Sequence, residues 1–242
     1  MLSQRLGCHY LHLGYEYRNL DATMKSLVER VMSLEPPGGV FDTTVVTNLF
    51  PEASAGARKL LVHRACAAGD IVRLKPGLFL LRREYRKTEL HPFAIAAMLH
   101  APSHVSLESA LAHHGLIPEA VQQVSSVTAD RGRSFRTPIG LYAFRRVPAR
   151  DPRAGVEAVQ LGRRDWAFIA TPLRALADLL YLNRSVSWPK DGMHYVVDSL
   201  RIEPDDLAGV SAAALPEICH SIRSRRVVAY LENLAREVQL AA

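Results

Sequence analysis

Between residues 54 and 87 the apolar positions first follow a helical period and then run continuously. The helical spacing predicts a helix that begins after Ser54, a good N-cap, and stops at Gly69-Asp70. We expect its buried side to consist of Ala57, Leu60, Leu61, Ala65 and Ala68, and its outer side of Arg58, Lys59, Val62, His63 and Cys66. Apolar runs over 71–74 and 78–81 then flank Lys75-Pro76-Gly77, and predict a two-stranded hairpin.

Two shorter helices are predicted before this segment. The first spans 22–34 and ends at Pro36-Pro37-Gly38-Gly39. Val40-Phe41 is expected to be extended, and Asp42-Thr43-Thr44 suits the cap of a second helix that stops near Pro51. The order helix, strand, helix, turn, helix, hairpin is that of a winged helix-turn-helix, which we predict for residues 21–90. Residues 1–20 have no clear period, and we treat them as an N-terminal arm without assigned function.

The character of the chain changes after a linker at 89–92. Helices are expected at 93–99, from Ser106 as N-cap to Gly115, and after Thr171-Pro172. Short strands are expected at 121–128, 134–137, 139–145, 156–161 and 167–170, and further helices near 195–200, 211–221 and 225–238. We therefore predict an α+β protein in which a second, mixed domain occupies residues 91–242.

Positive charge is concentrated in the predicted helix and hairpin. Residues 54–87 contain nine lysines and arginines but two acidic residues, a net charge of +7, whereas the whole chain carries +6. Such a surface is typical of proteins that follow the phosphates of DNA, although a solvated basic face has the same composition. The candidate DNA-binding residues are Thr44, Ser54, Arg58, Lys59, His63, Arg73 and Lys75. Arg58 and Lys59 lie where a recognition helix enters the major groove, and arginine can bind guanine in a bidentate manner.

A second group of arginines lies near the predicted strands of the second domain. Its members are Arg131, Arg133, Arg136, Arg145 and Arg146. They form a possible second basic surface for nucleic acid or an acidic partner. The alternative is that they serve solubility and form local ion pairs with Asp130, Asp151 and Glu157.

Catalytic, metal and membrane signals are weak. The three cysteines are far apart and lack a C-x-x-C spacing, so we expect reduced thiols, no zinc site and no cofactor. Adjacent helical residues such as His113 and His114 point about 100° apart, which disfavours binding of one metal ion by both. No long uncharged apolar run or signal-peptide pattern is present, so we expect a cytoplasmic protein without membrane contact.

Three stretches resemble AbiEi-type antitoxins, the transcriptional-regulator halves of bacterial abortive-infection toxin-antitoxin pairs that act in phage defence. They are the hairpin at 73–79, the segment from Pro102 to Gly140, and the helix signature ATPLRALADLL at 170–180. The resemblance covers roughly residues 22–182. It implies a winged domain that binds inverted repeats of double-stranded DNA at its own promoter and represses it. It also implies a C-terminal domain that opposes a nucleotidyltransferase-like toxin.

Two alternatives remain open from the sequence. A winged start can precede a small nuclease domain, but such enzymes need clustered carboxylates with a nearby lysine to hold Mg²⁺. In such enzymes the lysine stands two residues after a carboxylate, and neither Glu157 nor Asp165 is followed by a lysine at that position. We therefore expect no enzymatic activity and assign no catalytic residue. A stand-alone regulator without a toxin is the other alternative. In either case we expect the second domain to support self-association on DNA.

Overall fold

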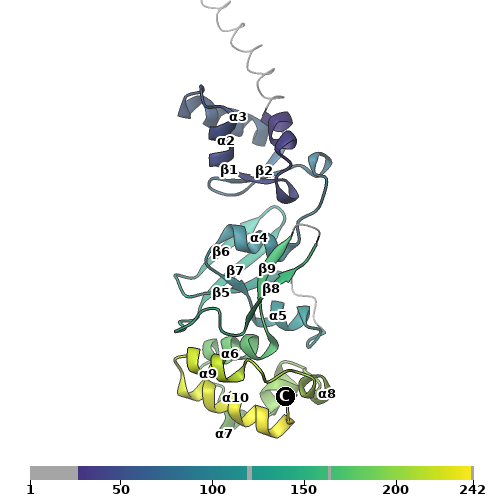
Figure 1. The fold of residues 1–242 in the computed structure, drawn as a ribbon, viewed down its shortest axis with the longest axis vertical. Coiled ribbons are helices and arrows are strands. Elements are labelled where there is room, and N and C mark those ends of the chain that lie inside the picture. Colours follow the sequence, from purple (N-terminus) through teal and green to yellow (C-terminus); the bar gives the residue numbers. More distant parts are fainter. Residues whose placement is uncertain (1–26, 119–121, 163–164, 241–242) are drawn as a thin grey trace, which may run out of the picture. The chain divides into compact units, whose positions relative to one another are not determined.

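The structure is a computed structural model that describes residues 27–118, 122–162 and 165–240. The chain divides into two compact units, Met1–Leu90 and His91–Ala242 (Figure 1). Both units combine helices with a β-sheet, so the protein is α+β, as the sequence predicted. The arm predicted for residues 1–20 and the start of the helix expected over 22–34 lie outside the described residues.

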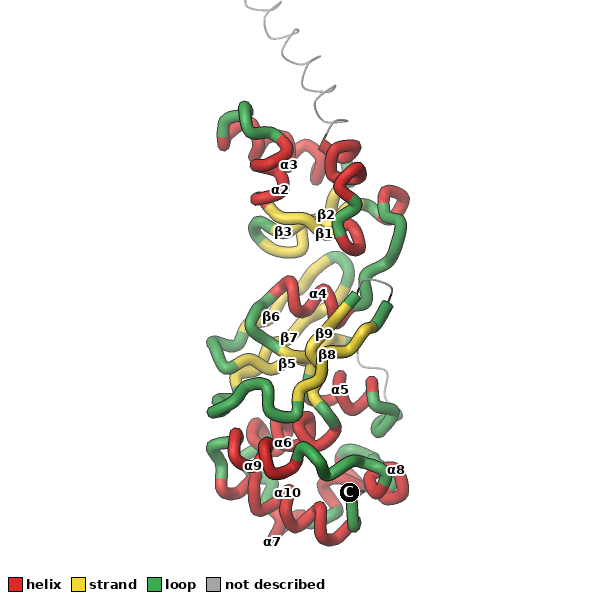
Figure 2. The backbone as a smooth tube through the Cα atoms, viewed as in Figure 1, coloured by secondary structure: helices red, strands yellow, loops and turns green. Residues whose placement is uncertain are grey.

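The described part of the first unit contains a helix at 27–34 and seven further elements. These are η1 (Pro37–Gly39), β1 (Val40–Asp42), α2 (Thr43–Leu49), α3 (Ala55–Ala67), β2 (Ile71–Lys75), β3 (Leu78–Leu81) and η2 (Arg83–Tyr85). The three strands form an antiparallel sheet in the order β1-β3-β2 (Figure 2). Apolar side chains from the helices and the sheet share one core, which includes Leu27, Val31, Phe41, Val46, Leu61, Ile71 and Phe79.

Side-chain caps fix where α2 and α3 begin. The Val45 amide donates to Asp42 Oδ1 over 2.9 Å, and the Ala57 amide donates to Ser54 Oγ over 3.2 Å. Each cap satisfies one of the amides that a helix N-terminus leaves without a partner, which contributes about 1 kcal/mol. The cap predicted at Ser54 is therefore confirmed, and Asp42 is the member of the Asp-Thr-Thr run that caps α2.

The buried side of α3 differs from the expected one. Leu61, Val62 and Ala65 are buried, whereas Leu60 is 41% exposed. Ala57 and Ala68, which we also expected to be buried, are exposed. An alanine-rich helix offers several stripes with the same period, and only the position of the neighbouring sheet selects among them.

The hairpin predicted at 71–81 is present as β2 and β3. Pro76 and Gly77 form its turn, and Gly77 has φ +82°, in the left-handed region that glycine tolerates best. The Thr43 amide donates to the Gly77 carbonyl over 3.1 Å. This bond joins the turn to the start of α2, so the hairpin tip is held against the body of the unit.

The second unit contains six strands, seven α-helices and one π-helical turn among its described residues. The strands are β4 (His104–Val105), β5 (Gln123–Thr128), β6 (Arg133–Thr137), β7 (Gly140–Arg146), β8 (Val156–Gln160) and β9 (Trp166–Ala170). The helices are α4 (Pro92–Leu99), α5 (Leu107–His113), α6 (Pro172–Leu182), α7 (Trp188–Asp191), α8 (Pro204–Ala208), α9 (Leu215–Ser221) and α10 (Arg225–Val238), and η3 (Tyr195–Ser199) is a π-helical turn.

The six strands form one mixed sheet in the order β6-β7-β5-β4-β9-β8. β5 runs parallel to β7 and β4 runs parallel to β9, while the other neighbours are antiparallel. α6 packs against α5, α9, α10 and β9, and Figure 1 shows α6, α9 and α10 together beyond the sheet. The core therefore lies between the sheet and these helices, with Leu111, Ile169, Leu173, Leu176 and Leu231 among its members.

Ser106 holds the N-cap position predicted for it, but the segment before it and its hydrogen bond differ from the prediction. We expected Ser103 to Ser106 to open a helix with Ser106 as its cap. Instead His104 and Val105 form β4, and α5 starts at Leu107 without a side-chain cap. The Ser106 hydroxyl donates to Asp178 Oδ2 over 2.7 Å, because α6 brings this carboxylate close to the end of β4.

Candidate functional site

The outer surface of α3 carries polar side chains with no structural partner. Lys59 and His63 are exposed, and neither makes a hydrogen bond or ion pair with a described residue. They are four residues apart, so they lie on one side of the helix together with the exposed Leu60. Gly56, one turn earlier, is also exposed and adds no side-chain bulk. This side of α3 is open to a ligand along its length.

Arg58 lies differently from the other basic residues of α3. Its Nη1 donates to the Phe50 carbonyl over 3.1 Å and to the Ala53 carbonyl over 2.5 Å. Arg30 donates similarly to the Leu49 carbonyl over 2.6 Å. The end of α2 leaves carbonyls without intrahelical partners, and cations are favourable there. The sequence had placed Arg58 on the outer side of α3, but the structure places its guanidinium against the turn between the two helices.

The remaining predicted residues of the first unit lie at the starts of α2 and α3 and on β2. Thr44 and Ser54 are exposed at the starts of α2 and α3. Arg73 on β2 is exposed, with its guanidinium carbon 5.8 Å from the centre of the Phe79 ring on β3. Lys75 is half-buried next to the turn. The hairpin therefore presents Arg73 more openly than Lys75.

Several of the other basic residues counted in the sequence are paired with acidic ones. Arg82 pairs with Glu84 over 3.0 Å, and Arg83 pairs with Glu89 over 2.8 Å. Lys87 pairs with Glu35. Two of these acids, Glu35 and Glu89, lie outside residues 54–87, so the net charge of that segment overstates the free positive charge on the unit.

Cys66, on the inner part of α3, is half-buried. Burial raises the pKa of its thiol, and the nearby Arg73 acts in the opposite direction. A raised pKa lowers the thiolate fraction at neutral pH, and the thiolate is the reactive form. Cys66 thus has the environment of a packing residue.

The five arginines proposed as a second basic surface do not share one side of the sheet. Arg133 is opposite Phe144, and Arg136 is opposite Leu141. Because successive residues of a strand alternate between faces, Arg133 and Arg146 project from one face, and Arg136 and Arg145 from the other. Arg131 precedes β6. Among the described residues, the expected partners Asp130, Asp151 and Glu157 form no ion pair with an arginine.

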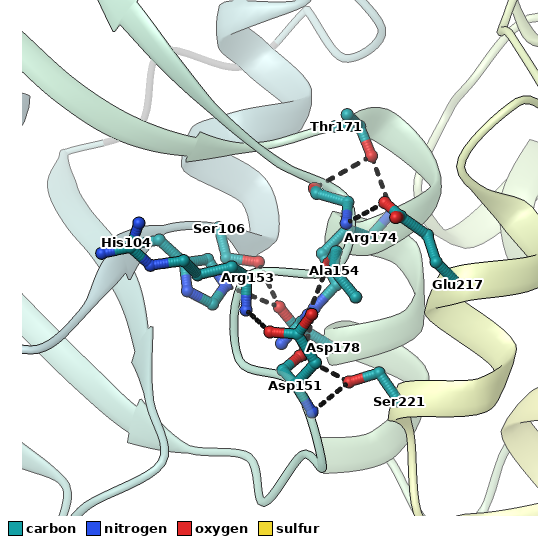
Figure 3. Close-up of polar contacts among 11 residues, drawn as sticks. His104, Ser106, Asp151, Arg153, Ala154, Thr171, Arg174, Asp178, Glu217 and Ser221 are labelled. Atoms are coloured by element: carbon teal, nitrogen blue, oxygen red, sulfur yellow. Dashed lines mark hydrogen bonds and ion pairs between the residues drawn. The ribbon is translucent and has the colours of Figure 1, made fainter.

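A buried polar cluster joins α6 to β4 and to the loop before β8 (Figure 3). Arg174 and Asp178 are fully buried, and Arg174 Nε donates to Asp178 Oδ1 over 3.1 Å. Arg174 Nη1 donates to the Ala154 carbonyl over 2.7 Å. Asp178 Oδ2 accepts from Ser106 Oγ and lies 3.3 Å from His104 Nε2. These four side chains form a closed hydrogen-bonded network inside the second unit.

The ionisation of Asp178 depends on this network. Burial alone raises the pKa of a carboxyl group, but the Arg174 guanidinium, with the hydrogen bonds from His104 and Ser106, holds the pKa of Asp178 below its usual value. Sequence reasoning missed the cluster, although Arg174 and Asp178 stand four apart within the apolar run of α6. Two charges at that spacing on a helix that is otherwise apolar are a usable signal of a buried pair.

His113 and His114 have separate structural roles. His114 Nε2 lies 2.9 Å from the Ala170 carbonyl, and the His113 ring packs edge-on against Phe93 with centres 5.7 Å apart. Burial is the main cause of a lowered pKa at His113, and the neighbouring His114 and His91 lower this pKa further. Within residues 27–118, 122–162 and 165–240, no three His, Cys, Asp or Glu side chains are grouped as metal ligands would be.

No protein-family model and no curated protein sequence matches this chain. In the part of the chain that the structure describes, no helix has the length and apolar content needed to cross a lipid bilayer.

Proposed function

We propose that this protein is a cytoplasmic, sequence-specific DNA-binding regulator that represses its own operon. Its first unit is a winged helix-turn-helix in which α3 is the recognition helix and β2 and β3 form the wing. The order of elements supports this assignment: the helix at 27–34, β1, α2, α3 and the hairpin follow each other with the sheet order β1-β3-β2.

The observation that carries the proposal is the outer side of α3. Lys59, Leu60 and His63 are exposed there without partners among the described residues, on the second helix of the helix–turn–helix. Lys59 supplies a positive charge for a phosphate or a guanine, and His63 supplies a hydrogen-bonding ring one turn further on. Leu60 offers apolar contact to a thymine methyl group. Together, these side chains can contact the hydrogen-bonding base edges and the thymine methyl groups that the major groove exposes.

Arg58 has a supporting role in this proposal. Its bonds to the Phe50 and Ala53 carbonyls fix the turn between α2 and α3, and hence the angle at which α3 meets DNA. Arg73 on the hairpin contacts a phosphate at the edge of the site. Ser54 and Thr44, at exposed helix starts, donate to phosphates in the same way.

The antitoxin role rests on the resemblance to AbiEi-type proteins. The second unit supports repression through contacts between neighbouring copies on DNA, and it opposes a nucleotidyltransferase-like toxin. This part of the proposal is tested separately, by co-expressing the protein with such a toxin from the same operon and measuring growth. If the toxin still arrests growth when the protein is co-expressed, the antitoxin role is excluded and the protein is a stand-alone regulator.

DNA binding is tested by gel shift and footprinting on the region upstream of the gene. We expect protection of an inverted repeat. Lys59→Ala weakens this binding, whereas Lys190→Ala, which removes another exposed lysine from the second unit, leaves it unchanged. Equal affinity of wild type and Lys59→Ala at physiological salt contradicts the assignment of α3 as the recognition helix.

A further inference from the structure

A cavity of about 510 Å³ opens on the sheet of the second unit. Four neighbouring strands, in the order β5-β4-β9-β8, contribute to its lining: Val127 and Thr128 from β5, His104 from β4, Phe168 from β9 and Val156 from β8. His104 and Val127 are directly opposite each other, so their side chains share one face of the sheet. Ligand pockets in proteins commonly have volumes of about 300 to 1,000 Å³. The cavity thus has the size of a small-molecule site.

Most polar groups around the cavity are already used. The Thr128 hydroxyl donates to the Pro102 carbonyl over 2.8 Å, and the Ser103 hydroxyl donates to the His100 carbonyl over 2.5 Å. Asp151 Oδ1 accepts from the Arg153 amide over 2.9 Å. These polar side chains therefore form hydrogen bonds with backbone groups of the cavity wall. The side chains of His104 and Arg153 remain available to a ligand.

His104 is the polar group best placed to recognise one. Its side chain is 6% exposed, and its Nε2 faces Asp178 Oδ2, the carboxylate oxygen that also accepts from Ser106, while Arg174 binds Oδ1. A carboxylate only accepts hydrogen bonds, so Nε2 carries the proton in the neutral imidazole. Nδ1 then holds a lone pair and has no hydrogen-bond partner among the described residues. An acceptor without a partner, on a residue that lines the cavity, favours a ligand that donates to it.

The surroundings of His104 favour an uncharged aromatic ligand. Phe168 on β9 is 41% exposed, although it is a large apolar side chain. The Arg153 guanidinium carbon lies 5.2 Å from the centre of the Phe168 ring, and such a cation also favours the face of a second aromatic ring. Arg153 and Asp151 have opposite charges, so together they offer no net attraction to an ionic ligand.

We propose that this cavity binds a small, neutral, planar aromatic molecule that carries an N–H or O–H group. The ring lies against the apolar wall formed by Val127, Val156 and Phe168, and its donor group bonds to His104 Nδ1. This site is separate from the proposed DNA-binding surface and does not depend on it.

Indole and N-methylindole are the probes that test this proposal, because they differ in the N–H donor. Each is titrated into the full chain, and binding is followed by amide chemical shifts in NMR spectra. We expect indole to shift signals of residues around the cavity, and N-methylindole to bind about tenfold more weakly, since it leaves His104 Nδ1 without a donor. Equal affinities, or no shift around the cavity with indole, overturn the proposal.

A substitution that fills the cavity gives an independent test. Ala97 on α4 lines the cavity and lies outside the polar cluster of His104 and Asp178. Ala97→Leu keeps a good helix former and is expected to weaken indole binding at least tenfold. Ala229→Leu, an equivalent change at an exposed position of α10, is the control and should bind as wild type does. Binding that persists in Ala97→Leu places the probe elsewhere and contradicts the proposal.

Discussion

Removal of the Asp178 charge should destabilise the second unit strongly. In Asp178→Asn the amide oxygen can still accept a hydrogen bond, but Arg174 becomes a buried cation without a counter-charge. Breaking one partner of a buried ion pair typically costs about 3 to 5 kcal/mol. In a unit of this size, roughly 2 to 4 °C of melting temperature is lost per kcal/mol, so we expect a decrease of about 6 to 20 °C.

Tryptophan fluorescence measures this effect in the full chain. Both tryptophans, Trp166 and Trp188, belong to the second unit, so their emission during urea or thermal unfolding reports on that unit alone. The matched control is Asp198→Asn. Asp198 also has a partner four residues away, His194, but both side chains are largely exposed. We expect little change in that variant, because solvent screens exposed pairs.

The stability from this pair should also depend on pH. The pKa of Asp178 is lower in the folded chain than the value of about 3.9 in an unfolded one. Folding therefore favours the ionised form, so its stabilisation is complete above pH 4 to 5 and is lost as the pH falls through the folded pKa. Asp178→Asn should show a shallower loss of stability in this acid range than wild type.

The reasoning is refuted if Asp178→Asn and Asp198→Asn unfold at the same urea concentration. A double variant separates charge from packing. Arg174→Met with Asp178→Leu replaces the pair with apolar side chains, and such replacements are often neutral or stabilising. We expect it to be more stable than Asp178→Asn alone. A double variant that is less stable than the single one shows that the network, rather than the unpaired cation, accounts for the loss.

Three further predictions concern DNA binding. Arg58→Ala should destabilise the first unit by about 1 kcal/mol in urea unfolding, because it loosens the turn between α2 and α3. For the same reason it should weaken binding to all DNA sequences equally. If the variant instead loses discrimination at a single base pair, Arg58 contacts a base directly. Arg73→Ala should reduce the slope of log K against log salt by about 0.9, and an unchanged slope means that the hairpin does not touch a phosphate. Inserting about 5 base pairs between the half-sites should abolish cooperative binding, since it rotates one site by half a helical turn; retained cooperativity excludes contacts that need a shared face of the duplex.

Local signals in the sequence were sufficient for most element positions. Ser54 marks the start of α3, Pro76-Gly77 marks the hairpin turn, and Thr171-Pro172 marks the start of α6. A cap, a turn or a proline at a helix start acts within three or four residues of itself, so its effect can be read without knowing the fold. The α+β class follows from the order of such elements.

The directions of side chains depended on tertiary contacts. Leu60 and Val62 are both compatible with a buried stripe on α3, and the position of the sheet buries Val62 and exposes Leu60. The Arg58 guanidinium lies against the turn because the carbonyls of Phe50 and Ala53 accept its hydrogen bonds there. A helical period fixes the spacing of residues but leaves the rotation of the helix open, and packing against the rest of the unit sets that rotation.

The buried cluster and the cavity were decided by the tertiary structure alone. His104 and Ser106 are 74 and 72 residues from Asp178, and no local pattern links them. A serine before a helix often caps it through its hydroxyl oxygen, but the Ser106 hydroxyl instead donates to Asp178 Oδ2, a buried carboxylate oxygen that needs hydrogen-bond donors. Local caps, turns and prolines in the sequence located most helices and strands, whereas packing decided that His104 and Val105 form a strand and which buried polar groups bond to one another.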